Sequence, residues 1–545
     1  MADKRAQEII ALRDRERAKQ DNFRSLWQET ADLEFPRENQ ITSRRTDGED
    51  KSRIYDSTAI MDSQDMASGL SAAFIPSGQQ FFALQTRDKK LNKQDNVRRY
   101  LAEATEITHE ALFESNFMLQ LNETLRSLVV FGTGNIFSEF DLESMGLNFK
   151  DYDIANYQIL ENSKGVVDGV IVTIPFTARQ ALQEFGVEAG PEVMKALSNP
   201  KTENDIFNFI HVVRPRKDRN PQLSDFSNMP YESVFVSEKD QLTVDEGGFD
   251  EFPFAVARWM KSSAEKYGRG QGTEVLADVR VLQTMKRDFI ECGNKWNNPA
   301  REVLDSFEGP VRVKPGALNY VSEMGSIKAL DQNLNGNFPI TKEMLEFQQE
   351  IVHKAFFRDI FVALGDMKGD RRTTVEIIER IKEGLRRLAL PVARLMSELF
   401  NPVVTRSVML LIRNGSIPEP PAELQGQAFG IEYIGELALA LRNQQAKAFQ
   451  QWASFVAQME AVFPGAVDNI DSDSAIKRMG SAFGVNTDDI SSDEEITAKR
   501  QARAQQQQQA QMMAMAETGG KAYKNASGKA EEGSPAQALM AGMGA

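Results

Sequence analysis

The stretch 373–399, TTVEIIERIKEGLRRLALPVARLMSEL, carries the clearest structural signal in this sequence. Thr373 and Glu376 have the spacing of a capping box, which marks the N-terminus of a helix. The apolar residues after it are separated by alternating steps of three and four, so they share one helix face. Pro391 should kink this helix without ending it, because the apolar pattern continues beyond it. That pattern comprises Ile378, Ile381, Leu385, Leu388, Val392, Leu395 and Leu399, and it resumes after Pro402 at Val404, Val408 and Leu411.

Further long helices are predicted on both sides of the loop that leads into this stretch. Residues 273–296 carry a narrow apolar stripe with a heptad-like spacing, and residues 341–361 carry a second stripe. Earlier in the chain, 1–35 and 94–131 are predicted helices. Pro36 should end the first of these, and Gly132-Thr133-Gly134 should end the second. The two stripes are Val275, Val279, Leu282, Phe289 and Trp296, and then Met344, Phe347, Ile351 and Ala355.

Residues 135–260 have a different pattern, in which β-rich runs are separated by Gly, Pro and Asn. A short helix is predicted among them at 177–185. We therefore expect an α+β unit inside a chain that is mostly α-helical. The β-rich runs are 136–140, 166–176, 209–213, 233–236 and 254–257.

The C-terminal third ends in biased composition. Residues 435–500 are predicted to be helical again. Residues 501–545 contain a glutamine run and are rich in Ala, Met and Gly, so we expect this tail to be disordered.

Charge and composition exclude several classes of protein. The chain has 545 residues and a formal net charge of −15, whereas proteins that coat nucleic acid depend on cationic surfaces. The single cysteine, Cys292, excludes an intrachain disulfide, and with three histidines a zinc site is nearly excluded. The charged N-terminus lacks the apolar core of a signal peptide. We expect an intracellular protein, or one assembled inside a cell, without cofactor or metal.

Catalytic motifs are not evident in the sequence. The glycines of Tyr267–Gly272 precede a helix, so this loop is either a strand-to-helix turn, which we favour, or an anion-binding loop. His353 is interpreted as an ordinary surface or packing residue, and Cys292 as a small apolar residue. The cationic cluster of Lys368, Arg371 and Arg372 is either a solvated loop or a contact for a phosphate backbone.

The order of these segments resembles the head-to-tail connector, or portal, proteins of short-tailed bacteriophages. The resemblance spans about residues 5–520, and it depends on the order and spacing of several motifs more than on any one. They are Leu125–Asn135 (LRSLVVFGTGN), Tyr267–Gly270 (YGRG), the helix start Arg371–Glu376 (RRTTVE) and the Gly/Ala/Met/Gln-rich end.

The resemblance implies a structural subunit, not an enzyme, in a ring of twelve at one capsid vertex, with double-stranded DNA passing through its channel. It implies the following parts: a wing at 1–272 with a return at 373–434, stem helices at 273–296 and 341–361, a clip at 297–340, a tunnel loop at 362–372, a helical crown at 435–500 and the tail at 501–545.

The resemblance also implies partners. The clip, with Arg301, Arg312 and Lys314, would contact the packaging ATPase (terminase) and the tail adaptor. The tunnel loop, with Lys368, Arg371 and Arg372, would contact DNA. Major capsid and scaffold proteins would complete the set, in a virion assembled in the host cytoplasm without a membrane. In the ring, an acidic channel with few loop cations would let DNA slide.

Two alternatives stay open from the residues alone. One is another ring-forming virion protein, such as a scaffold or tail component, without a DNA channel. The other is an acidic enzyme whose active site is built from residues distant in sequence.

Overall fold

The computed structural model contains two compact units, Met1–Ala438 and Leu439–Ala545, which we describe separately. The residues that it describes are 3–38, 40–42, 54–75, 80–88, 90–220, 222–223, 225–297, 301–305, 310–312, 318–321, 327–329, 342–365, 387–426, 429–434, 449–459, 463, 465, 470–473, 475–476, 479 and 493–526.

The α+β unit predicted for 135–260 is confirmed, and antiparallel sheets form its centre. A five-stranded sheet has the order β4-β5-β6-β7-β8, and a three-stranded sheet has the order β3-β2-β9. Their strands are β2 (Thr133–Asp141), β3 (Gly146–Asp151), β4 (Tyr157–Glu161), β5 (Val167–Thr177), β6 (Ile206–Pro215), β7 (Tyr231–Ser237), β8 (Leu242–Phe249) and β9 (Phe254–Arg258).

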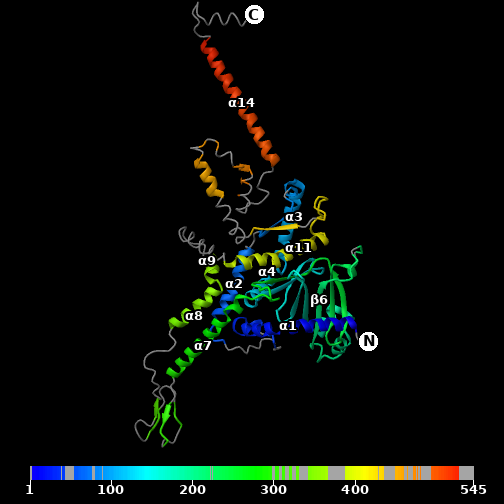
Figure 1. Ribbon diagram of the computed structural model, residues 1–545, viewed down its shortest axis with the longest axis vertical. Coiled ribbons are helices and arrows are strands. Elements are labelled where there is room, and N and C mark those ends of the chain that lie inside the picture. Colours follow the sequence, from blue (N-terminus) through cyan, green and yellow to red (C-terminus); the bar gives the residue numbers. More distant parts are fainter. Residues whose placement is uncertain are drawn as a thin grey trace, which may run out of the picture. The chain divides into compact units, whose positions relative to one another are not determined.

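Helices cover both faces of the five-stranded sheet. The N-terminal helix α1 (Lys4–Glu34) lies along one face, where Ile9 packs with Ile210 and Val212 of β6 (Figure 1). The opposite face carries Phe207 and Phe209 of the same strand. There it packs against α5 (Ala178–Phe185) and α6 (Pro191–Leu197), because side chains alternate between the two faces of a strand.

Segments far apart in sequence complete this unit. The helices α2 (Thr58–Phe74), α3 (Asp95–Glu114) and α4 (Phe117–Phe131) precede the sheets. Strand β1 (Phe82–Thr86) pairs antiparallel with β12 (Phe429–Tyr433), so the chain returns to its N-terminal half near residue 430. Short 3-10 turns lie at Pro36–Glu38, Leu91–Lys93, Gly186–Ala189 and Phe226–Asn228.

Two predicted helices are interrupted, which corrects our expectation for each. The segment 94–131 divides into α3 and α4 at Ser115 and Asn116, where Asn116 binds the β3 backbone with its side-chain amide. The segment 341–361 divides into α8 (Lys342–Ala355) and α9 (Arg358–Gly365), with Phe357 at φ 55° between them.

The long helix predicted from the opening stretch is confirmed for the part that the structure describes, 387–413, whereas 366–386, with Thr373 and Glu376, lie outside it. The helix passes Pro391 and then widens into a π-helical turn at Met396–Phe400 before α11 (Asn401–Arg413). The wider turn accommodates Pro402, which has no N–H for an intrahelical bond. The described stripe residues are all buried: Leu388, Val392, Leu395, Leu399, Val404, Val408 and Leu411.

The helix at 387–413 is also long and apolar enough to cross a membrane by length and composition, but 56% of its most apolar window is buried inside the protein. Burial of this kind is what a core helix shows.

The second unit contains a helical segment at 449–459 and the long helix α14 (Asp493–Ala526). This helix corrects our expectation of disorder from residue 501. Gln, Ala, Lys, Arg and Met all favour helices, so a polar low-complexity segment can be helical without burying a face. Residues 497–513 are exposed accordingly.

Candidate assembly surface

The two glycine motifs that carry the resemblance pack against each other. The Gly268 N–H donates to the Thr133 hydroxyl over 3.0 Å, and the Trp259 N–H donates to the Gly132 carbonyl over 2.9 Å. A Cβ atom on Gly270 would lie 2.4 Å from the Val129 carbonyl oxygen. The glycines of the 267–272 loop are therefore explained by backbone packing, which supports the interpretation of this loop as a strand-to-helix turn.

Helix α7 (Gln271–Asn297) begins within this loop, and it runs beside α8 (Figure 1). We call α7 and α8 the helix pair. The N-terminal half of α7 is buried at Val279 and Leu282, which belong to the predicted stripe, and the C-terminal end of α8 is buried at Val352. The Gln348 amide donates to the Asp278 carboxylate over 3.1 Å and so ties the two helices together.

The exposed surface of the helix pair is mostly charged and polar, but four large apolar side chains are exposed on it. The Phe347 side chain is 69% exposed, although a phenylalanine in a single folded chain is usually covered. Exposed apolar residues that gather on one element are candidates for contact with another chain. The other exposed apolar residues of the pair are Val281, Ile290 and Met344.

A buried ionic cluster holds the break between α8 and α9. The Asp62 carboxylate of α2 is 2% exposed and lies 2.6 Å from His353 Nδ1 and 3.8 Å from Arg358 Nε. Burial raises the pKa of Asp62, against the opposing effect of the His353 contact. Gly69 of the same helix contacts Phe361, so α9 packs directly on α2. His353 is therefore a packing residue, as predicted, with an acidic partner that the sequence did not reveal.

The segment after α9 carries the predicted DNA contact, and it lies outside the described residues. Lys368, Arg371 and Arg372 all belong to it. Their role stays a prediction.

The predicted clip contains a short hairpin. Strands β10 (Arg301–Val303) and β11 (Ile327–Ala329) pair antiparallel, and Arg301 lies opposite Ala329. Arg301 and Arg312 are both exposed, and neither guanidinium bonds to another residue in the described part of the chain. Lys314 lies outside that part. Tyr320, in the same segment, is 86% exposed.

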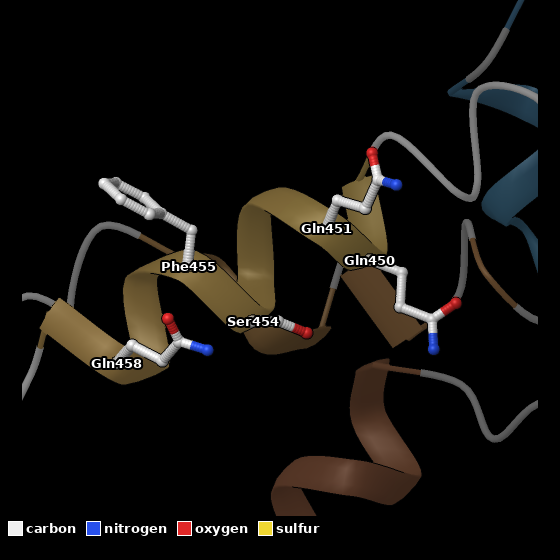
Figure 2. Close-up of a pocket in the computed structure, with 5 residues that line it drawn as sticks. All are labelled: Gln450, Gln451, Ser454, Phe455 and Gln458. Carbon is white, nitrogen blue, oxygen red and sulfur yellow. The ribbon is translucent and has the colours of Figure 1, made fainter.

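Within the described ranges, no three His, Cys, Asp or Glu side chains gather in a way that could hold a metal ion. The second unit has a hollow of about 540 Å³ beside the helical segment 449–459. Figure 2 shows that its walls come from this one segment. Among the described residues its lining is uncharged and consists of Gln450, Gln451, Ser454, Phe455 and Gln458, which supply no acid, base or activated nucleophile.

The family model described as "Bacteriophage head to tail connecting protein" matches residues 6–490. The chain belongs to this family. Head-to-tail connecting proteins are structural components of the virion.

Two curated relatives extend the likeness along nearly the whole connector chain. The portal protein of Salmonella phage epsilon15 is 27% identical over 516 residues, which cover 93% of this chain and 92% of the relative. The probable portal protein of Bordetella phage BPP-1 is 24% identical over 510 residues, which cover 92% of each. The protein is therefore a phage portal, or head-to-tail connector, subunit.

Proposed function

We propose that this connector forms a closed ring of twelve subunits at one capsid vertex. The observation that carries the proposal is the exposed apolar surface of the helix pair, above all Phe347. A closed ring uses heterologous contacts, in which each subunit presents two different complementary faces. The pair would be the stem of the ring, with one subunit's exposed residues covered by the next.

The channel of this ring would pass double-stranded DNA during packaging and ejection. The net charge of −15 supports sliding over tight binding, because the affinity for DNA grows with each phosphate contact. Lys368, Arg371 and Arg372 would supply the few cationic contacts at the narrowest point. Replacing all three with Ala should alter packaging or retention of DNA while rings still assemble, and unchanged packaging and retention would contradict the role.

The clip would dock the packaging ATPase (terminase) and later the tail adaptor. The exposed Arg301 and Arg312, and the exposed Tyr320 beside them, support this role, because Arg and Tyr are enriched at protein interfaces. Deleting 297–340 should abolish adaptor binding. Major capsid and scaffold proteins would surround the ring, in a virion assembled in the host cytoplasm.

The assembly proposal is tested by Phe347→Ser, with Leu142→Ser as the matched control. Leu142 is similarly exposed but lies in the turn between β2 and β3, away from the helix pair. Phe347→Ser should shift the chain from rings toward monomers in size-exclusion chromatography, without lowering its melting temperature as a monomer. If Phe347→Ser formed rings at the same protein concentrations as the wild type, a stem interface at this residue would be contradicted.

A further inference from the structure

A cationic pocket lies between α1, the five-stranded sheet and residues 40–42, far in sequence from the helix pair. Its volume is about 140 Å³, and its lining includes Arg13, Arg17, Arg24, Asn208, Gln158 and Glu238. Pockets for drug-sized ligands are usually at least ~300 Å³, so this one suits an ion or a very small molecule.

The charges in the pocket are not balanced. Arg13 is paired, because its guanidinium lies 2.5 Å from Glu238 and 2.7 Å from Asp14. Arg24 is only 6% exposed, yet it donates only to carbonyl oxygens, those of Ala155 at 3.1 Å and of Ile41. Burial, and then the neighbouring Arg17, lowers the pKa of Arg24.

Arg17 is the second cation, and the pKa of Glu238, which burial raises, is lowered by hydrogen bonds from Arg13 and Asn208 and by the charges of Arg13 and Arg17. In the described part of the chain, no carboxylate lies within ion-pair distance of Arg17 or Arg24. A buried charge without a partner is costly, and an anion in the pocket would offset that cost.

The pocket also contains a buried acceptor without a donor. Gln158 is 2% exposed, and its Oε1 has no hydrogen-bond partner among the residues that the structure describes. Two hydrogen bonds fix the orientation of the Gln158 amide. Gln20 Nε2 donates to the Tyr157 carbonyl over 3.2 Å, which leaves Gln20 Oε1 to accept from Gln158 Nε2 over 3.3 Å. Oε1 is therefore a buried acceptor that no donor among the described residues satisfies.

We propose that this pocket binds a hydrogen-bearing phosphate anion. The anionic oxygens would face the guanidinium groups of Arg17 and Arg24, which match tetrahedral oxyanions well. The P–O–H group of hydrogen phosphate would donate to Gln158 Oε1. Sulfate and the phosphodiesters of a DNA backbone carry the same negative oxygens but no hydrogen, so they satisfy the arginines and leave this acceptor unpaired.

The test is calorimetric titration of the full chain with inorganic phosphate at pH 7, at an ionic strength held constant with NaCl. Arg17→Gln is the variant, and Arg15→Gln is its matched control, since Arg15 lies on the same helix and outside the pocket lining. Arg17 is exposed, so its replacement should leave the fold intact. We expect saturable binding that Arg17→Gln weakens about tenfold and Arg15→Gln leaves within about twofold.

Two further titrants identify the source of the anion. Sulfate should bind about tenfold more weakly than phosphate. Glycerol phosphate has a second pKa of about 6 and so carries mostly no P–O–H group at pH 7; it should therefore also bind more weakly than inorganic phosphate, which would indicate the free ion as the ligand.

Three results would overturn it: phosphate binding no greater than that of chloride, equal phosphate binding by wild type and Arg17→Gln, or sulfate binding equal to phosphate. A chain that binds no phosphate while Arg17→Gln disturbs ring formation would assign the pocket to a carboxylate of another copy, which also overturns it. The phosphate and sulfate titrations do not require ring assembly, so their failure is distinct from failure of the proposed function.

Discussion

Replacing Gly270 with Ala should destabilise the first unit strongly. A Cβ atom at this position would lie 2.4 Å from the Val129 carbonyl oxygen, 2.7 Å from the Gly132 nitrogen and 2.8 Å from the Val130 carbonyl oxygen. All three are backbone atoms, so no side-chain rotation relieves the contact. Overpacking usually costs ~1–3 kcal/mol, and rigid surroundings place this substitution near the upper end, at about 3 kcal/mol.

Gly293→Ala is the matched control, because it makes the same chemical change in α7 with nothing within 4 Å of the new methyl group. Gly to Ala inside a helix stabilises by roughly 0.5–1 kcal/mol. The effect of the methyl group on the unfolded chain is similar in both variants and cancels in their comparison.

The two variants should therefore differ by about 3–4 kcal/mol in the free energy of unfolding. Urea unfolding monitored by tryptophan fluorescence measures this difference, because Trp27 and Trp259 are fully buried in the first unit. Trp259 is also bonded through its backbone to Gly132, next to the substituted site. If Gly270→Ala unfolded at the urea concentration of Gly293→Ala, the packing argument for the 267–272 loop would be wrong.

Three other outcomes follow from buried charges and from the tunnel loop. Burial lowers the pKa of His211 to about 3 in the folded protein, so the contribution of its neutral form to stability is complete above pH ~6.5 and is lost as the pH falls toward 3. His211→Gln should therefore reduce the slope of the unfolding free energy against pH by about 1.4 kcal/mol per pH unit between pH 4 and 6. An unchanged slope would refute this. Arg258→Met should lower the free energy of unfolding by about 3–5 kcal/mol, measured with heat or urea, because the Glu398 carboxylate that lies 2.6 Å from the guanidinium would lose its partner. Adding Glu398→Met to the same chain should recover part of that loss. Lys368→Ala alone should alter the rate of DNA packaging less than the triple substitution does, since phosphate contacts add, and equal effects would count against shared contacts.

The regular apolar patterns allowed much of the fold to be predicted. The stripe from Leu388 to Leu411 is buried as expected, and the β-rich runs form strands of the two sheets. Burial of an apolar face leaves a periodic trace in sequence, so such elements are visible without a structure.

The inward face of α1 could not be predicted in the same way. It is buried at Arg13, Glu16, Gln20 and Arg24, between the apolar Ile9 and Trp27. These polar residues are paired with groups of the sheet and its loops, which no local pattern shows. For this reason the sequence revealed neither the buried side of α1 nor the cationic pocket beside it.

The breaks within helices were missed for a related reason. Phe357 adopts φ 55°, which is unfavourable for a bulky residue, and contacts from α2 hold the neighbouring helices in place. The pairing of β1 with β12 joins residues more than 340 positions apart, and tertiary packing alone determines it. Of the predicted site, the structure shows Arg301 and Arg312 exposed on the hairpin segment, and the three cations at 368–372 stay a prediction.

The central claim is ring assembly, and native mass spectrometry of the purified chain with negative-stain images of the same sample tests it most directly. Twelve chains of 61.1 kDa give a species of about 730 kDa, which should appear as a closed ring with a central hole. A stable monomer or dimer at high concentration would contradict the account, because the exposed apolar residues of the helix pair would then have no neighbouring subunit to cover them.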